Sequence, residues 1–340
     1  MSLHFLACRM RFCLPVLILF LFPLHTFPQS SEKLFAGVAF PLDGPLVMSG
    51  LQVSSLETPE WKSASWPGFP LRTMTIASSN RSSRLLLGGP GGLLLPFTNP
   101  TGWQLLADWR LTDVLDVKVD PFAEQVIFVA TATGIYISRD RGATWQPRNN
   151  GLASKFVSCL LFDPRQSGHL MAGTESGLYE SSDHGANWRL LEFSGIPVRA
   201  MLREPESFPG IYWVGTEYRG LFESFDGGKI FEPVDMQRDS VSVYALAGGG
   251  ANAPIYAGLF EHGLYSASSP GENWSPMESS KILGTVFCIL PLEEHKIIFA
   301  GTHRNGVMRS DDHGRTWRNF GLKGVAVRAL IAGEAGWSKP

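Results

Sequence analysis

The sequence lacks an excess of charge of either sign, and it lacks metal-ligand and phosphate-binding motifs. Its 340 residues carry 29 Lys and Arg against 31 Asp and Glu, a net charge of −2 at pH 7. This balance gives no electrostatic case for binding nucleic acid or an anionic membrane surface. The eight histidines are scattered, no C-x-x-C or H-E-x-x-H spacing occurs, and the glycine-rich stretch at 88–92 opens no helix that could cradle a phosphate. We therefore expect no metal, no cofactor and no nucleic-acid partner.

Cysteine is also scarce, and the four cysteines do not predict a disulfide framework. Cys8 and Cys13 lie in an N-terminal segment that we expect to be a signal. Cys159 and Cys288 occupy equivalent places in repeats that stand three units apart, and such positions should not meet in space. We expect both to be buried free thiols, because free cysteine is among the most buried residue types.

Long hydrophobic runs are absent except near the N-terminus, where 13 apolar residues from Phe12 to Leu24 follow two arginines. This pattern is typical of a secretory signal. The run is shorter than the roughly 20 residues that a membrane span needs. We expect residues 1–30 to be a signal peptide and the mature chain to be secreted, periplasmic or otherwise extracytoplasmic. An uncleaved N-terminal anchor is the alternative, because no small-residue cleavage site is evident.

What the sequence does contain is a repeat. The phrase Ser-Arg-Asp-Arg-Gly-Ala-Thr-Trp at 138–145 recurs with small changes at 181–188, 224–231 and 310–317, and a worn copy lies at 267–274. One aromatic closes each unit, at positions 61, 103, 145, 188, 231, 274 and 317, a step of 42 or 43 residues. A fixed period of this size indicates an array of supersecondary units. We number the units 1 to 7 by these aromatics.

Each unit has the pattern of four short strands. In unit 4, apolar stretches at 157–162, 169–174, 178–181 and 187–191 are separated by Asp, Pro and Gly turn signals. Four antiparallel strands per unit of about 43 residues are typical of a propeller blade. We therefore predict an all-β fold, a single seven-bladed β-propeller of four-stranded antiparallel blades that occupies residues 31–340.

The repeated phrase has a structural explanation. Its Asp accepts backbone N–H bonds in a turn, its Gly supplies a positive φ, and its Trp packs between neighbouring sheets. We therefore assign structural roles, and no catalytic role, to Asp140, Asp183, Asp226, Asp312, Trp145, Trp188 and Trp317.

The two ends of the repeat array predict how the ring closes. Residues 33–37 are similar to 297–301, which we expect to be a second strand of a blade, so the N-terminus enters its blade one strand late. Residues 326–330 are similar to 197–201, which we expect to be a first strand. We predict that residues from about 325 to 334 complete the blade begun at Lys33, which would remove exposed sheet edges.

The phrase Ser-x-Asp-x-Gly-x-Thr-Trp resembles the Asp-box, or BNR repeat. The copies at Asp140 and Asp312 match in full, and the copy at Asp183 differs only in Asn187. This repeat occurs in sialidases, sortilin-type receptor ectodomains, xyloglucanase-like glycoside hydrolases and photosystem II assembly and stability factors. The resemblance covers about residues 33–334, and the length and seven units are most similar to the photosystem II factor group and to secreted BNR proteins. It implies the fold but does not fix the activity.

Candidate binding residues lie in the turns between second and third strands. In such blades these turns share one face with the connections between blades, whereas the Asp-box turns lie on the other face. In blades 4–7 the turns carry Glu175, Glu217, Tyr218, Arg219, Glu261, His262, His303 and Arg304. The alternative is that these turns are polar only because they face water.

The innermost strands carry a second signal. Their second residue is Arg72, Leu115, Ser158, Arg199, Tyr244, Phe287 or Arg328, and we expect this position to surround the mouth of the central channel. Arg72, Arg199 and Arg328, with Tyr244, could hold an anion such as a carboxylate. Alternatively, each arginine is solvated or pairs locally with Asp113, Asp116, Glu204 or Asp239.

We predict a monomeric, secreted, non-catalytic propeller that binds a protein or peptide, or acts as an assembly scaffold, through the face formed by blades 4–7. The alternative is a sialidase-like glycoside hydrolase, or a glycan-binding propeller, that uses the channel mouth. Asp116 and Glu217 are candidates for the two carboxyls that glycosidic chemistry usually needs. The Arg-Ile-Pro context of sialidases is absent, because the order here is Ile196-Pro197-Val198-Arg199.

Overall fold

The computed structural model describes most of the repeat array. The residues that it describes are 32–42, 49–64, 68–78, 83–96, 103–106, 110–204, 207–238, 240–248 and 253–334. The predicted signal segment 1–30 and Asp239 lie outside the described residues. Within the described part, no helix has the length and hydrophobicity needed to cross a membrane.

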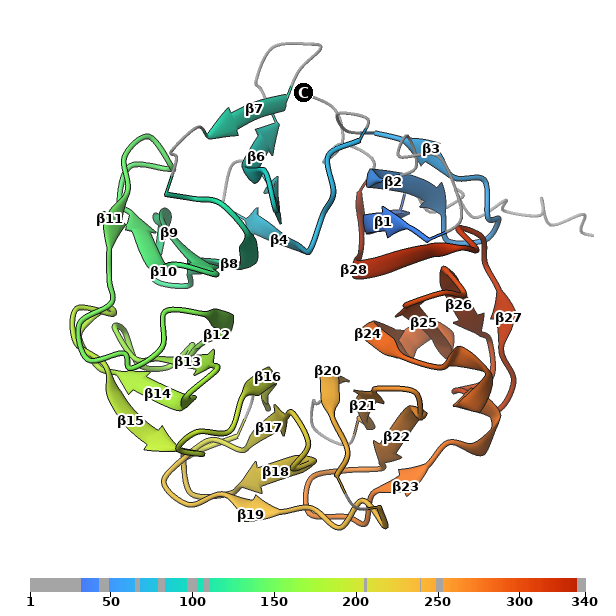
Figure 1. Ribbon diagram of the computed structural model, residues 1–340. Helices are drawn as coiled ribbons and strands as arrows, with labels where there is room; N and C mark the ends of the chain where they lie inside the picture. The colour runs from blue at the N-terminus through green and yellow to red at the C-terminus, as the bar shows by residue number, and fades with distance from the viewer. Residues whose placement is uncertain are drawn as a thin grey trace, which may run out of the picture. The chain divides into compact units, whose positions relative to one another are not determined.

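The described residues form seven four-stranded antiparallel sheets arranged as blades around a ring (Figure 1). From the innermost strand outward, blade 1 contains β28 (Val325–Glu334), β1 (Glu32–Pro41), β2 (Gly50–Ser55) and β3 (Lys62–Ser63), and blade 2 contains β4 (Thr73–Ser78), β5 (Ser83–Gly89), β6 (Gly92–Pro96) and β7 (Trp103–Leu106). Blade 3 contains β8 (Val114–Asp120), β9 (Ala123–Thr131), β10 (Gly134–Ser138) and β11 (Gln146–Pro147), and blade 4 contains β12 (Val157–Phe162), β13 (Leu170–Thr174), β14 (Gly177–Ser181) and β15 (Arg189–Glu192). Blade 5 contains β16 (Val198–Arg203), β17 (Tyr212–Thr216), β18 (Leu221–Ser224) and β19 (Glu232–Pro233), and blade 6 contains β20 (Val243–Gly248), β21 (Ile255–Leu259), β22 (Gly263–Ala267) and β23 (Ser275–Pro276). Blade 7 contains β24 (Val286–Leu292), β25 (Ile297–Thr302), β26 (Val307–Ser310) and β27 (Arg318–Asn319), and the short 3₁₀ helices η2 (Glu278–Leu283) and η3 (Glu293–His295) precede and interrupt it. The predicted seven-bladed all-β fold is confirmed.

The hydrophobic core lies between adjacent blades. Second strands such as β13, β17 and β21 are buried along their whole length, because both faces of each sheet pack on a neighbour. Trp145 and Trp188 are almost fully buried, each in a cluster that joins its own blade to the preceding one. The indole N–H of Trp188 also donates to the carbonyl of Arg148 in blade 3, at 2.9 Å. The aromatic of each unit thus connects successive blades.

Six of the seven second strands contain a glycine where the next blade approaches closely, and β9 has Ala130 at the equivalent place. A Cβ on Gly215 would lie 2.8 Å from Cγ1 of Val243, the first residue of β20, and one on Gly301 would lie 2.9 Å from Cγ1 of Val327. These distances are shorter than side chains tolerate, so only glycine lets the innermost strand of the next blade pack this closely.

The Asp-box forms a hydrogen-bonded turn between the third and fourth strands. In blade 3, Ser138 Oγ donates to Asp140 at 2.8 Å and accepts from the Gly142 N–H at 2.7 Å. The Thr144 hydroxyl and N–H both donate to the Asp140 carboxylate, at 2.6 and 2.8 Å. These bonds from Thr144 lower the pKa of Asp140 to about 2. Arg141 and Gly142 both have positive φ, 59° and 93°, which the tight turn requires.

The same turn occurs around Asp183, Asp226 and Asp312 in blades 4, 5 and 7. In each, the box serine donates to the aspartate at 2.8–2.9 Å, and the aspartate accepts backbone N–H bonds from the residues that follow. These carboxylates are fully engaged in holding a hairpin and lie away from the channel cavity described below. Trp317 is partly buried and packs against the core between blades 6 and 7.

The ring closes through blade 1, which is built from both ends of the repeat array. Strand β28 pairs antiparallel with β1 over a register from Glu32↔Glu334 to Pro41↔Val325, and Figure 1 shows the two strands side by side. The indole N–H of Trp61 donates to the Phe320 carbonyl of blade 7 at 2.7 Å. Arg309 of blade 7 donates to the Leu56 carbonyl of blade 1. The predicted closure by residues 325–334 is confirmed.

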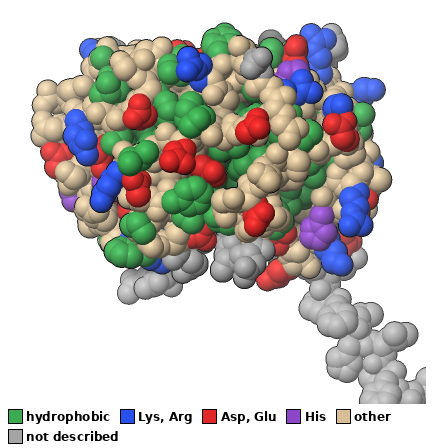
Figure 2. Space-filling view, turned by 90° about the horizontal axis from the view of Figure 1, so that it is seen from below, with side chains coloured by type: hydrophobic (Ala, Val, Ile, Leu, Met, Phe, Trp, Pro, Cys, Tyr) green, Lys and Arg blue, Asp and Glu red, His purple; other side chains and the backbone are tan. Residues whose placement is uncertain are grey.

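Two kinds of turn define the two faces of the ring. The second-to-third turns bond to the connections between blades, as in Glu217 N–H to Pro197 O at 2.9 Å. The Asp-box turns bond instead to the first-to-second turns, as in His184 N–H to Gly168 O at 3.0 Å. We call the first the connection face and the second the Asp-box face. Seen edge-on from the side of β19 and β23, charged side chains of both signs are interspersed with hydrophobic ones (Figure 2).

Candidate functional site

A β-bulge recurs in the innermost strands at the residue that the sequence places at the channel mouth. The strand pairing skips this residue in blades 3–7 and in blade 1. In blade 5, Val198 faces Thr216 and Ala200 faces Gly215, which leaves Arg199 unpaired between them. A bulge inserts an extra residue and redirects its side chain, so the fold turns one side chain per blade out of the sheet. The skipped residues are Leu115, Ser158, Arg199, Tyr244, Phe287 and Arg328.

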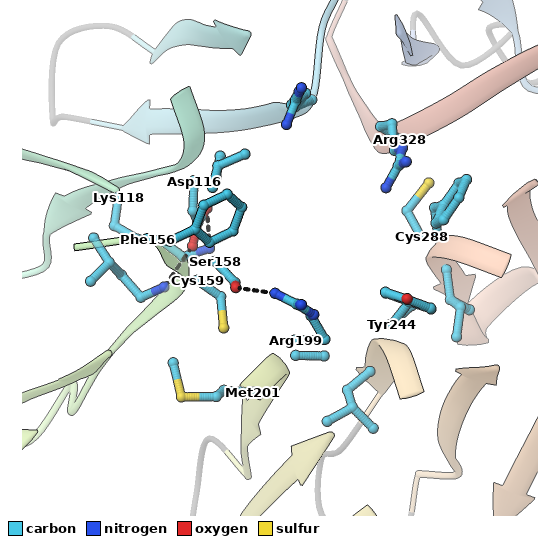
Figure 3. A pocket seen from close by; sticks show the side chains of 18 of the residues that line it. Asp116, Lys118, Phe156, Ser158, Cys159, Arg199, Met201, Tyr244, Cys288 and Arg328 are labelled. Atoms are coloured by element: carbon cyan, nitrogen blue, oxygen red, sulfur yellow. Dashed lines mark hydrogen bonds and ion pairs between the residues drawn. The ribbon is translucent and has the colours of Figure 1, made fainter. Parts of the chain in front are cut away.

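These side chains converge on one cavity of about 460 Å³ in the central channel. All six bulged residues line it, together with Arg72, which immediately precedes β4 in blade 2. Figure 3 shows Arg199 and Arg328 entering this space from different blades, with Tyr244 beside it. A cavity of this size is in the range of small-molecule and peptide side-chain sites.

Arg199 lies at the centre of an ion-pair cluster. Its Nε donates to Glu217 at 2.9 Å, and its Nη1 donates to Glu175 at 2.8 Å and to the Ser158 hydroxyl at 3.1 Å. Burial by itself would lower the pKa of Arg199, but the hydrogen bonds and charges of the two glutamates raise it above the ordinary value. The guanidinium also lies 6.0 Å from the ring centroid of Phe156. Arg199 therefore pairs with two second-to-third turns and not with Glu204, the local partner considered from the sequence.

The other two arginines are placed differently. Arg72 forms an ion pair with Asp113 at 3.2 Å, as the local alternative expected. Arg328 has no carboxylate partner among the described residues. Arg328 is accessible from the channel, but the channel walls remove part of the water around its guanidinium. This desolvation, together with the charge of Arg72, lowers the pKa of Arg328 to about 10. Arg328 remains cationic at neutral pH and is free to bind an anion.

Aromatic rings form a continuous row from the connection face to Arg328. Phe260 lies 6.1 Å from Tyr244, Tyr244 lies 6.0 Å from Phe287, and Phe287 lies 5.7 Å from His303, measured between ring centroids. The guanidinium carbon of Arg328 lies 3.5 Å from the Phe287 centroid, a cation–π stack. Burial, Arg304 and Arg328 lower the pKa of His303, which favours the neutral imidazole. Blades 6 and 7 thus give the cavity an apolar wall.

Asp116 is buried and already has partners. Its carboxylate accepts the N–H groups of Val117 and Leu160, each at 2.9 Å, and the hydroxyl of Thr73 at 3.3 Å. Lys118 lies 3.3 Å from the same carboxylate. These contacts join three blades, so Asp116 serves the packing of the ring.

Cys159 and Cys288 are free thiols, as expected for equivalent positions in distant repeats. They are half-buried in the wall of the cavity, less buried than the sequence predicts. The reason is that each directly follows the bulged residue of its strand, beside the channel. Burial raises the pKa of both thiols to about 12.

The remaining candidates lie on the connection face outside the cavity. Tyr218 is 63% exposed, and a hydrogen bond to Glu217 raises the pKa of its hydroxyl. Four further residues are exposed on the rim of blades 5–7 without lining the cavity: Arg219, Glu261, His262 and Arg304. Two apolar side chains join Tyr218 on this rim, Phe260 at 47% and Ile282 at 57% exposure. We call Tyr218, Phe260 and Ile282 the rim trio.

Sequence reasoning missed two features of the site. Phe156 and Ile282 come from connections between blades, which carry no repeat signal. The bulge was also missed, although the glycine that opposes it recurs in the second strands, as at Gly173 and Gly301.

Comparison with known proteins agrees with this architecture. The family model of the BNR/Asp-box repeat matches residues 136–147, which hold the whole box of blade 3. The chain is thus a seven-bladed β-propeller that carries a BNR/Asp-box repeat. A comparison with curated proteins gives no match.

Solved structures of similar fold have several kinds of function. The chain is similar to the GH74 xyloglucanase from Xanthomonas campestris, with a TM-score of 0.57 and 19% identity over 69% of this chain and 43% of that chain. It is similar to the extracellular domain of the one component system BT4673 from B. thetaiotaomicron, with a TM-score of 0.60 and 16% identity over 83% and 38% of the two chains. It is also similar to YCF48 bound to D1 peptide, with a TM-score of 0.57 and 14% identity over 78% and 84%. The chain thus spans less than half the length of the first two, and at these identities the likeness concerns the fold.

Proposed function

We propose that the protein is a non-catalytic, extracytoplasmic propeller that binds a protein or peptide through the connection face of blades 4–7. The observation that carries this proposal is the rim trio of exposed apolar side chains, which continues through Phe260 and Tyr244 into the channel cavity. Exposed apolar groups next to a concave site are typical of interaction surfaces. Two similar folds are consistent with this role, because YCF48 is bound to a peptide and the BT4673 domain is extracellular.

The second candidate, a glycoside hydrolase, is motivated by the GH74 neighbours and by the aromatic row. Such catalysis usually needs one carboxyl as acid and another as base or nucleophile, both free to reach the sugar. The described carboxylates in or beside the cavity are held by ion pairs or hydrogen bonds that do not suit a free acid or a nucleophile. Glu175 and Glu217 share Arg199, and Asp116 accepts three hydrogen bonds. This arrangement favours binding over hydrolysis.

The experiment compares partner capture by three forms of the purified chain. The first is the wild type, and the second has the rim trio replaced by serine. The third has serine in place of Phe208, Phe225 and Ile230, which are 86%, 43% and 63% exposed on the Asp-box face. A partner captured from the native envelope or culture fluid should be lost with the rim variant and kept with the Asp-box-face variant. The reverse pattern, or robust turnover of a panel of fluorogenic glycosides by the wild type, would overturn the proposal.

A further inference from the structure

The charged groups of the channel mouth are separated across the cavity. On the side of blades 4 and 5, two carboxylates, Glu175 and Glu217, share the one guanidinium of Arg199, which leaves one negative charge in excess. On the side of blades 1 and 2, Arg72 is neutralised by Asp113, and Arg328 has no described acidic partner, which leaves one positive charge in excess. The mouth is therefore close to neutral as a whole but bipolar.

Tyr244 lies between the two poles. The charges of Glu217, Arg199 and Arg328 all act on its hydroxyl, and its ring packs 6.0 Å from Phe287. Figure 3 shows Tyr244 between Arg199 and Arg328 at the edge of the opening. An apolar group resting on Tyr244 and Phe287 would thus have an anionic wall on one side and a cationic wall on the other.

We propose that the channel mouth binds a zwitterionic ligand, a short peptide with both termini free. Its ammonium pairs with Glu175 and Glu217, its carboxylate pairs with Arg328, and an apolar side chain packs on Tyr244 and Phe287. A carboxylate suits the planar fork of an arginine, and an ammonium suits a pair of carboxylates. The 460 Å³ cavity limits the ligand to a few residues. This inference rests on the proposed function, because it specifies which peptides the connection face admits.

The test uses the dipeptide Leu-Phe as the probe, titrated calorimetrically into the full-length protein. Two derivatives each remove one charge: N-acetyl-Leu-Phe lacks the ammonium, and Leu-Phe-amide lacks the carboxylate. Loss of a hydrogen-bonded charge pair should weaken binding roughly 10- to 100-fold. Both derivatives should therefore bind more weakly than Leu-Phe by about this factor.

Variants of the protein test which terminus of the dipeptide binds at each side of the cavity. Glu217→Gln should weaken binding of Leu-Phe but not of the acetylated form, and Arg328→Met should weaken binding of Leu-Phe but not of the amide. The matched controls are Glu272→Gln and Arg315→Met, exposed residues of Asp-box turns in blades 6 and 7, which should bind like the wild type. Cooperative thermal unfolding of each of the four variants is the check that the variant is folded.

Two results would overturn the inference. The first is equal affinity for Leu-Phe and both derivatives, and the second is no binding of any of them at millimolar concentration. If the rim variant still loses its partner in either case, the proposed function stands and only the zwitterionic ligand is wrong. If partner capture is insensitive to the rim trio as well, both proposals fail.

Discussion

Replacing Gly215 by alanine should strain the contact that positions the channel wall. A Cβ at this position would lie 2.8 Å from Cγ1, and 2.9 Å from both Cβ and the carbonyl oxygen, of Val243. Val243 immediately precedes the bulged Tyr244, so relief of the clash must move the strand that carries Tyr244. Overpacking of this kind costs about 1–3 kcal/mol of unfolding free energy. At roughly 2–4 °C per kcal/mol, Gly215→Ala should lower the Tm by about 2–12 °C.

Gly37 provides the matched control for this prediction. It occupies the equivalent place in the second strand of blade 1, but a Cβ there would meet its nearest neighbour, Cβ of Ala329, at 3.3 Å. Gly37→Ala should therefore cost clearly less than Gly215→Ala. Calorimetric melting of the two variants beside the wild type measures the difference, and near-ultraviolet circular dichroism reports the movement of aromatic rings. Equal Tm values for both variants would refute the idea that close contact between blades sets the position of the bulged residue.

Three other predictions follow from the fold. Trp61→Phe removes the 2.7 Å bond to the Phe320 carbonyl at the closure seam, so chemical denaturation should show a loss of about 1 kcal/mol, and an unchanged midpoint would contradict this role. The Asp-box carboxylates, with pKa values of about 2 in blades 3, 4 and 7, stabilise the folded state above their ordinary pKa near 4 and lose this effect as the pH falls toward 2. The Tm should therefore fall between pH 4 and pH 2, and less steeply in Asp140→Asn; an equal fall in both proteins would argue against the turn bonds. Cys159 and Cys288 have pKa values of about 12, so few of these thiols are reactive thiolates at pH 8. Iodoacetamide should therefore alkylate them at least about a hundredfold more slowly in the native than in the unfolded protein. Fast alkylation of the native protein would show that the thiols are more solvent-accessible than described.

The fold could be predicted from the sequence because the same strand and turn pattern recurs in successive units, so each unit supports the interpretation of the others. The aromatic spacing sets the number of blades, and the turn chemistry around Asp140 recurs often enough to separate it from chance. The closure was predictable for the same reason, since residues 326–330 match a first strand that has no later partner in the chain. Local pattern and global topology agree at these positions.

The site was predictable only in part. Comparing equivalent positions identified seven of the residues that line the cavity, because a position in one blade implies the same position in the others. The comparison of positions could not predict the side-chain partners of these residues. Arg199, for example, forms ion pairs with Glu175 of blade 4 and Glu217 of blade 5, and a single sequence carries no signal for contacts between repeats. It could not find Phe156, because the connections between blades vary in length and have no common register. The half-buried state of Cys159 depended on the bulge, which alternation of apolar residues does not reveal.

The most direct test of the account is photo-crosslinking from one exposed aromatic position on each face. A photoreactive p-benzoylphenylalanine replaces either Tyr218 on the connection face or Phe208 on the Asp-box face, which are 63% and 86% exposed. With the captured partner present, irradiation should yield a crosslinked product from position 218 and none from position 208. Crosslinking from position 208 alone would contradict the claim that the partner binds on the connection face.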